Sequence, residues 1–182
     1  MDEYMDLSAH WQHYKTLAPA ARQNYLEQQI HPLLFARLTP SIAPRPNSSI
    51  HTLGTSIEPV VIAARKIAAC DVYLLGSKET LPLAEKIAAY CPEQKIHALE
   101  IERAGTRSIY SAVRQVVAPY STLALEITSG TKAMVAALAM MAQQLQLEGC
   151  GVQLFYVDNP NWDAEARRPM PGFEQLVQLE LP

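Results

Sequence analysis

The sequence predicts an α/β fold: a mostly parallel sheet with helices on both faces, preceded by a helical extension at the N-terminus. From residue 50 onward, short β-rich runs alternate with longer helical patterns. Four strand–helix pairs in a row require parallel strands joined by crossover helices. Before residue 39, apolar residues recur at helical spacing instead.

Composition narrows the functional classes. The chain has 182 residues, enough for one domain with an appendage, and 49% of them are hydrophobic, as in globular proteins. The formal net charge of −3 argues against a general DNA or RNA binder, although a small anion could still bind in a local pocket. The acidic N-terminus is not a signal peptide, and no apolar run is long enough to span a bilayer. The three cysteines (Cys70, Cys91 and Cys150) lack metal-ligand spacing. We therefore expect a cytoplasmic, reduced protein without metal, cofactor or membrane contact.

The N-terminal region, residues 1–38, is predicted to be a helical extension. Ser8 is a candidate N-cap, and Trp11 and Tyr14 follow it at helical spacing. Pro32 is expected to kink or split a second helix. Residues 39–49, "TPSIAPRPNSS", form a predicted proline-rich linker, which leaves residues 50–182 as the main domain.

The elements of the main domain follow one another in regular alternation. The predicted strands cover residues 49–53, 71–76, 94–101, 121–128, 151–158 and 173–181. The predicted helices cover residues 58–69, 80–91, 108–118 and 132–146. In open sheets of this kind, ligands bind beyond the carboxyl ends of the strands. The first five strands end in loops rich in small hydroxyl residues, glycine or charge: residues 54–56, 76–80, 102–106, 128–132 and 158–163.

The loop after the fourth strand, "TSGTK", has the residues of an anion-binding site. The N-terminus of a helix presents free N–H groups and a partial positive charge, and Gly130 would let an anion approach the backbone. Thr128, Ser129 and Thr131 add hydroxyl groups, and Lys132 adds a charge that opposes the helix dipole. A helix cap at Ser129 or Thr131 would explain one hydroxyl, but it would not explain the whole run.

The loop after the first strand, "GTSIEPV", is the second candidate. Gly54 permits a tight turn, and Thr55 and Ser56 offer hydroxyl groups at a helix N-terminus. Ser56 could equally be a plain N-cap. Gly76 and Ser77, after the second strand, complete the predicted ligand-binding set. The chain contains no Walker A motif, and no GxGxxG follows a strand, so ATP hydrolysis and NAD chemistry lose support.

Together these loops resemble the CRISPR-associated Rossmann-fold (CARF) family. The similar segments are "LGTSIEPVVIAA", "DVYLLGSKETLPLAEKIA", "EITSGTKAMVAALAMMA" and the closing "FEQLVQLELP". The likeness covers residues 50–182, and the order and spacing of the motifs carry it. One departure is Ser129, where a glycine is common; a serine fits unless the backbone there needs a positive φ.

The resemblance implies a Rossmann-like homodimer that binds a cyclic oligoadenylate, a type III CRISPR second messenger, and cyclic tetra-adenylate above all. Three interpretations stay open: a ring nuclease that cleaves the messenger without a metal, a sensor that only binds it, or part of a larger effector. A generic nucleotide-binding Rossmann protein is a further alternative. For cleavage, the expected catalytic residues are Lys132, which would stabilise charge, and Thr55 and Ser56, which would position the phosphate or ribose.

Other polar and aromatic residues receive weaker predictions. Glu102, Arg103 and Arg107 are more typical of a solvated surface than of a site. Trp162 could stack on a base or anchor its own loop. His51 and His97 fall within predicted strands, where a histidine is more often structural. No histidine lies in a predicted strand-end loop, which argues against cleavage by a pair of histidines.

Overall fold

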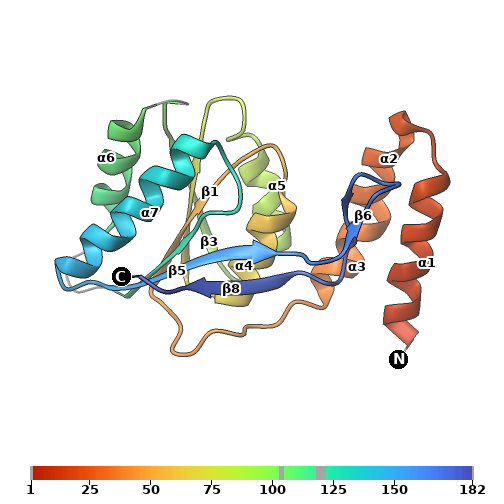
Figure 1. Ribbon diagram of the computed structural model, residues 1–182, viewed down its shortest axis with the longest axis horizontal. Coiled ribbons are helices and arrows are strands. Elements are labelled where there is room, and N and C mark those ends of the chain that lie inside the picture. Colours follow the sequence, from red (N-terminus) through yellow and green to blue (C-terminus); the bar gives the residue numbers. More distant parts are fainter. Residues whose placement is uncertain (1, 103–104, 118–121, 182) are drawn as a thin grey trace. The chain divides into compact units, whose positions relative to one another are not determined.

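The computed structural model describes residues 2–102, 105–117 and 122–181 (Figure 1). Its chain divides into two compact units. One, the helical unit, combines Met1–Thr39 with Asp158–Gln175; the other, the sheet unit, combines Pro40–Val157 with Leu176–Pro182. The sheet unit contains the two loops that the sequence singles out, whereas the helical unit joins two distant parts of the sequence.

The sheet unit has the expected α/β architecture. Its strands are β1 (Ser48–Thr52), β2 (Asp71–Gly76), β3 (Lys95–Glu100), β4 (Thr122–Glu126), β5 (Gly151–Asp158) and β8 (Gln175–Leu179). They form one sheet in the order β3-β2-β1-β4-β5-β8. The first five strands pair in parallel, and β8 runs opposite to β5 (Figure 1). The predicted fold class is confirmed.

Four helices connect the parallel strands: α4 (Glu58–Ile67), α5 (Leu83–Tyr90), α6 (Thr106–Val116) and α7 (Lys132–Leu147). Helices α6 and α7 lie on one side of the sheet, and α4 and α5 lie on the other (Figure 1). Ile50 and Leu125 pack in the core beneath α6 and α7, whereas Ala124 and Phe155 pack against α4. Because side chains alternate along a strand, the neighbours of Ile50 and Leu125 face α4.

The strand order reverses at β1. The chain adds β2 and β3 on one side of β1 and then crosses over to place β4 on the other side. Consequently, the loop after β1 leads to a helix on one face, and the loop after β4 leads to a helix on the opposite face. A crevice opens between such diverging loops at the carboxyl ends of the strands.

The helical unit contains α1 (Asp2–Thr16), α2 (Pro19–Tyr25), the π-helical turn η1 (Leu26–Ile30), α3 (His31–Ala36) and the short strands β6 (Trp162–Asp163) and β7 (Arg168–Pro169). The N-cap prediction for Ser8 is wrong, because Ser8 lies inside α1. Pro32 is the second residue of α3, and the π-helical turn ends two residues before it. Proline lacks the N–H that would bond one turn back, so the hydrogen-bond ladder must shift there.

The β6–β7 hairpin belongs to the helical unit because it contacts α1. The Nε1 of Trp11 donates to Asp163 Oδ2 at 3.0 Å, and Trp11 stacks on Tyr14 with ring centroids 4.8 Å apart. Lys15 forms ion pairs with Asp163 at 3.5 Å and Glu165 at 3.2 Å. Hydrogen bonds, first from the Ala166 N–H and then from Trp11, lower the pKa of Asp163. These contacts give the extension a partner that lies about 150 residues away in the sequence.

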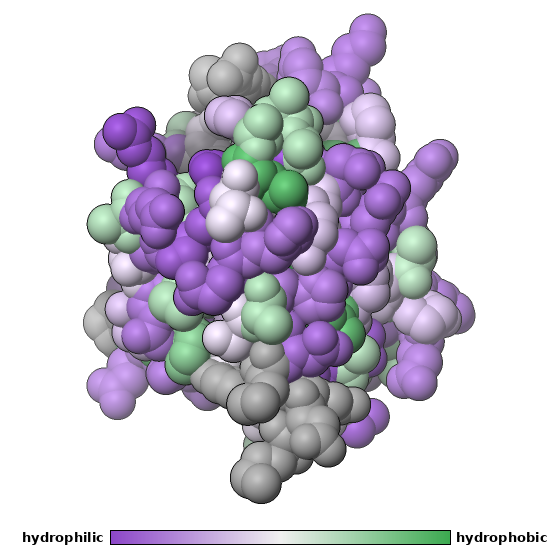
Figure 2. Space-filling view, turned by 90° about the vertical axis from the view of Figure 1, so that its right-hand side faces the viewer, coloured by the Kyte–Doolittle hydropathy of each residue, from purple (hydrophilic) through white to green (hydrophobic). Residues whose placement is uncertain are grey.

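Within the described ranges, no helix is long and apolar enough to cross a membrane. On the face drawn in Figure 2, hydrophilic side chains predominate, and hydrophobic ones form small separate groups. Small exposed hydrophobic groups are normal on protein surfaces.

Leu138 on α7 is fully buried in the core of the sheet unit. Its truncation tests how α7 packs on the sheet. Leu138→Ala should lower the free energy of unfolding by about 2–5 kcal/mol, because it leaves a cavity. Gln146→Ala on the exposed side of the same helix should change it by no more than about 0.5 kcal/mol. Urea denaturation measures both; equal effects would contradict the assigned core face.

Candidate functional site

The two loops that the sequence singles out meet at the carboxyl edge of the sheet. A Cβ atom added to Gly54 would lie 2.8 Å from the backbone nitrogen of Gly130 and 3.7 Å from the Cβ of Ser129. Such a distance to backbone leaves no room for a side chain at Gly54. The loops after β1 and β4 therefore touch at the point where the strand order reverses.

The loop after β4 turns sharply into α7. Gly130 has φ +88°, and a Cβ there would lie 2.9 Å from Met134 Cε, so the turn requires glycine. Thr131 is the N-cap: its Oγ1 accepts from the Met134 N–H at 3.3 Å, and its own N–H points to the Met134 sulfur at 3.3 Å. Lys132 is the first residue of α7 and is exposed. The N–H groups of the first helical residues have no acceptor within a helix, so they can bind an anion.

The other two polar residues of this loop differ in accessibility. Thr128 is exposed, and its Oγ1 accepts from the Val157 N–H at 2.6 Å, so the hydroxyl can still donate. The Thr128 N–H is already committed, because it donates to Glu126 Oε1 at 2.6 Å. Ser129 is only 8% exposed. The positive φ falls on Gly130 and not on Ser129, so a serine is accommodated where the family often has a glycine.

The loop after β1 presents two exposed hydroxyl groups, on Thr55 and Ser56. The alternative of a Ser56 N-cap is wrong, because the N-cap of α4 is Ile57, which makes no side-chain cap. Ser56 instead donates to the Glu58 carboxylate in the first turn of α4. This hydrogen bond uses the proton of the serine hydroxyl. The lone pairs of its oxygen can still accept a hydrogen bond from a ligand.

The loop after β2 lies beside the loop after β1. A Cβ on Gly76 would lie 3.3 Å from Leu53 Cδ2 and 2.8 Å from Thr80 Oγ1. Ser77 donates to Glu79 at 2.5 Å, and a turn over residues 78–82 precedes α5, which begins three residues later than predicted. Gly76 is buried and Ser77 half-buried. Their predicted contact with a ligand stays a prediction, with Ser77 the more accessible of the two.

A buried polar pair lies directly below the two loops. His51 in β1 and Glu126 in β4 are register partners, and both side chains are 0% exposed. His51 Nδ1 lies 3.6 Å from Glu126 Oε2, and His51 Nε2 lies 2.9 Å from Ser49 Oγ. Because His51 is buried, it cannot contact a ligand, in agreement with its predicted structural role. Glu126 was not among the predicted site residues, although an acidic residue in the apolar run "LALEI" was a visible signal.

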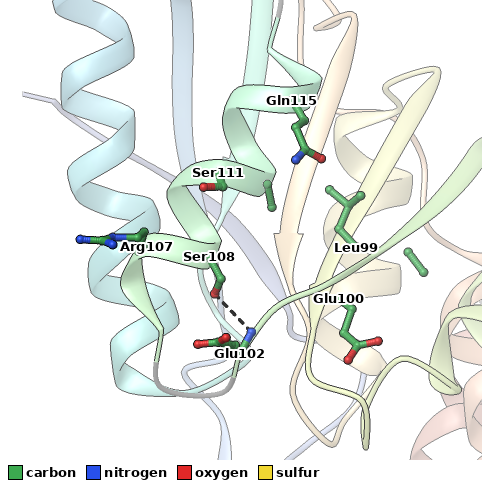
Figure 3. A pocket seen from close by; sticks show the side chains of 9 residues that line it. Leu99, Glu100, Glu102, Arg107, Ser108, Ser111 and Gln115 are labelled. Carbon is green, nitrogen blue, oxygen red and sulfur yellow. Dashed lines mark hydrogen bonds between the residues drawn. The ribbon is translucent and has the colours of Figure 1, made fainter.

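The loop after β3 borders a separate hollow of about 540 Å³ (Figure 3). Ser108 Oγ accepts from the Glu102 N–H at 3.2 Å, and Gln115 points across the hollow toward Leu99, whereas Arg107 points away from it (Figure 3). The carboxylates of Glu100 and Glu102 at its border disfavour a phosphate. Arg103, the remaining charged residue of this loop, lies outside the described residues.

Two further candidates are His97 and Trp162. His97 in β3 hydrogen-bonds Asp71 Oδ1 at 2.8 Å and stacks on Tyr73, as expected for a structural histidine. Trp162 lies in the β6–β7 hairpin of the helical unit and is 62% exposed, so burial of its ring does not anchor that loop. Among the described residues, no group of three His, Cys, Asp or Glu side chains could hold a metal ion.

Comparisons with known proteins place this arrangement in a family. No protein-family model matches the chain. The chain is 33% identical over 186 residues to the CRISPR system endoribonuclease Csm6 of Thermus thermophilus. The similar region covers 97% of this chain and 40% of that relative. Among solved structures, it resembles Can2 from Sulfobacillus thermosulfidooxidans in complex with cyclic tetra-adenylate, with a TM-score of 0.53 and 16% identity over 74% of this chain and 37% of the other. A protein from Vibrio cholerae has a TM-score of 0.50 and 12% identity, over 61% of this chain and 30% of the other.

The chain belongs to the CARF family. It spans 40% of the length of the curated relative. The two solved structures share its fold. In this chain, the loops after β1 and β4 lie where the strand order reverses, at the carboxyl edge of the sheet.

The contact between the two loops predicts a specific sensitivity at Gly54. Gly54→Ala should force the loops apart and lower the free energy of unfolding by about 1–3 kcal/mol, because the methyl group meets backbone that cannot rotate away. Gly105→Ala is the control, since its methyl group would meet only the side chains of Glu102 and Ser108. Urea denaturation measures both variants. A Gly54 variant as stable as the wild type would show that the loops do not touch.

Proposed function

We propose that this CARF domain binds a cyclic oligoadenylate, with cyclic tetra-adenylate as the first ligand to test. The observation that carries the proposal is the contact of the Gly54 and Gly130 loops at the reversal of strand order. From this contact we expect the exposed hydroxyl groups of Thr55 and Ser56, the start of α7 and the Lys132 ammonium to face one ligand. These are the donors that a phosphodiester requires.

The size and charge of the ligand agree with this set of donors. A cyclic tetra-adenylate carries four phosphates in a compact ring, so a few N–H groups, hydroxyls and one lysine per subunit can hold it without a basic surface. The net charge of −3 is therefore no obstacle. The complex of Can2 with the same ring supports this choice, because that protein shares the fold.

A homodimer is part of the proposal. Met140 and Leu147 on α7 are 63% and 83% exposed, although large hydrophobic residues are seldom so exposed in pairs. They continue a line of exposed residues on one helix face that begins at Lys132 and passes Ala136, with steps of four residues to Met140 and then seven, two helical turns, to Leu147. A two-fold axis along this face would bring both copies of α7 together and give a two-fold ring two equal half-sites.

Cleavage of the ring is a second candidate function, favoured by the exposed hydroxyls of Thr55 and Ser56 on a loop that touches the loop before Lys132. A ribose 2′-oxygen would form a bond to the adjacent phosphorus while the bond from phosphorus to the 5′-oxygen breaks. The 2′-proton passes to water, and the leaving 5′-oxygen takes a proton from water. The protein would orient the 2′-hydroxyl through Thr55 and Ser56 and stabilise the extra negative charge through Lys132.

Substitution of Lys132 tests the binding site. Lys132→Ala should raise the Kd for cyclic tetra-adenylate roughly tenfold or more, because a charged hydrogen bond to phosphate contributes about 1.5–3 kcal/mol. Lys95→Ala removes an exposed lysine at the amino end of β3 and should leave the Kd unchanged. Isothermal calorimetry with both variants gives the comparison. Equal affinity of the Lys132 variant and the wild type would remove this lysine from the site.

Product analysis separates the competing functions. The protein is incubated with cyclic tri-, tetra- and hexa-adenylate in the presence of EDTA, and the nucleotides are then separated by chromatography. Linear products that end in a 2′,3′-cyclic phosphate identify a ring nuclease, and their formation should slow in Lys132→Ala. Binding without products identifies a sensor, and no binding to any ring rejects the proposed ligand class in favour of a generic nucleotide-binding protein.

The dimer surface gives another prediction. Met140→Glu combined with Leu147→Glu should convert a species with the mass of two chains into one with the mass of a single chain, because four carboxylates would face one another across the axis. Gln146→Glu, elsewhere on α7, is the matched control and should leave the mass unchanged. Light scattering coupled to gel filtration measures the mass. A double variant that keeps the mass of two chains would place the interface elsewhere.

A further inference from the structure

The buried pair of Glu126 and His51 lies one or two residues before the two loops of the crevice. Both side chains are 0% exposed, and the two residues are register partners on β4 and β1. They face α4, where Ala124 and Phe155 form the apolar surroundings. Placing a carboxyl group in such surroundings is costly unless its oxygens are paired, so the contacts of Glu126 require an explanation.

Each oxygen of Glu126 has a different neighbour. Oε1 accepts the Thr128 N–H at 2.6 Å, the short distance typical of a carboxylate acceptor. Oε2 lies 3.6 Å from His51 Nδ1, and neither of these atoms has a hydrogen-bond partner among the described residues. One oxygen therefore holds the backbone of the loop, and the other faces the imidazole.

The contact of Glu126 with His51 is a close approach and not a hydrogen bond, because 3.6 Å between Oε2 and Nδ1 is too long for one. The other nitrogen of the ring, His51 Nε2, lies 2.9 Å from Ser49 Oγ. The contact with Ser49 holds the imidazole in place beside the carboxyl group of Glu126.

We propose that Glu126 is a positioning residue, held by His51, that sets the start of the 128–132 loop in the form that binds the ligand. The proposal rests on the proposed function. Thr128 is fixed at two points: its N–H by Glu126, and its Oγ1 by the Val157 N–H at 2.6 Å. Its position decides where Gly130 meets Gly54 and where α7 begins.

The competing explanation is that the pair only fills space in the core. An apolar pair of similar volume would fill the same space and would often be as stable as a buried ion pair. It would not provide an acceptor for the Thr128 N–H. The two explanations therefore predict different ligand affinities for variants of equal stability.

The sheet supplies a matched control pair. His97 Nε2 and Asp71 Oδ1 are 2.8 Å apart on β3 and β2, and they too form a cross-strand histidine–carboxylate contact. Asp71 is the first residue of β2, at the edge of the sheet opposite the crevice. This pair is partly exposed, and its removal eliminates a cross-strand histidine–carboxylate contact without affecting the loops.

The experiment measures the Kd for cyclic tetra-adenylate in the full chain, together with thermal stability. Glu126→Gln keeps an acceptor for the Thr128 N–H and should bind within about threefold of the wild type. The double variant Glu126→Leu with His51→Leu should fold with near wild-type stability and bind about tenfold more weakly or worse. Asp71→Leu with His97→Leu should bind like the wild type.

Hydrogen exchange of a peptide that spans residues 127–131 gives a readout without ligand. Exchange should be faster in the Glu126 and His51 double variant than in Glu126→Gln; if the double variant does not fold, Glu126→Met takes its place. The proposal would be overturned if the folded apolar variant bound the ring with wild-type affinity, or if Glu126→Gln weakened binding as much as that variant does. Equal exchange rates in the two variants would also overturn it. A wild-type protein that binds no ring would overturn the proposed function instead, and the exchange comparison would still decide the role of Glu126.

Discussion

The close approach of Gly54 to Gly130 is the constraint on which the crevice depends. The two loops leave the sheet toward opposite faces, and their contact leaves no room for a side chain at Gly54. Gly130 meets a second requirement, because its positive φ turns the chain into the Thr131 cap. One backbone contact thus fixes the start of α7 relative to the loop after β1, and with it the position of Lys132.

The buried carboxyl group of Glu126 lies below this contact, close to where an anion is proposed to bind. A carboxylate without a partner at the position of Glu126 would be costly to bury and would repel an anion bound above it. The Thr128 N–H donates to one oxygen of this carboxyl group, and the His51 imidazole lies beside the other. Both contacts offset the cost of burying Glu126 below the proposed anion site.

The sequence was sufficient to predict the fold, and it located both loops. Parallel strands end at a common edge, so Gly54 and Lys132 could be assigned to one site before any contact was known. The pairing of His51 with Glu126 depends on the register of two strands about 75 residues apart, which no local pattern reveals. The Ser56 cap failed for a local reason: α4 begins one residue later than such a cap requires, with Ile57 at the N-cap position. The contact of Trp11 with Asp163, which ties the hairpin to α1, is likewise invisible to periodicity.

Helix α7 links ligand binding to assembly in the proposed dimer. Its first residue is Lys132, and the same helix face carries Met140 and Leu147. A ring that draws two copies of Lys132 together must then also favour contact between two copies of this face. Because coupling between binding equilibria is reciprocal, any factor by which the dimer improves ring affinity equals the factor by which the ring stabilises the dimer. A single helix with a charged start and exposed apolar residues is sufficient for such coupling, and no movement within the sheet is required.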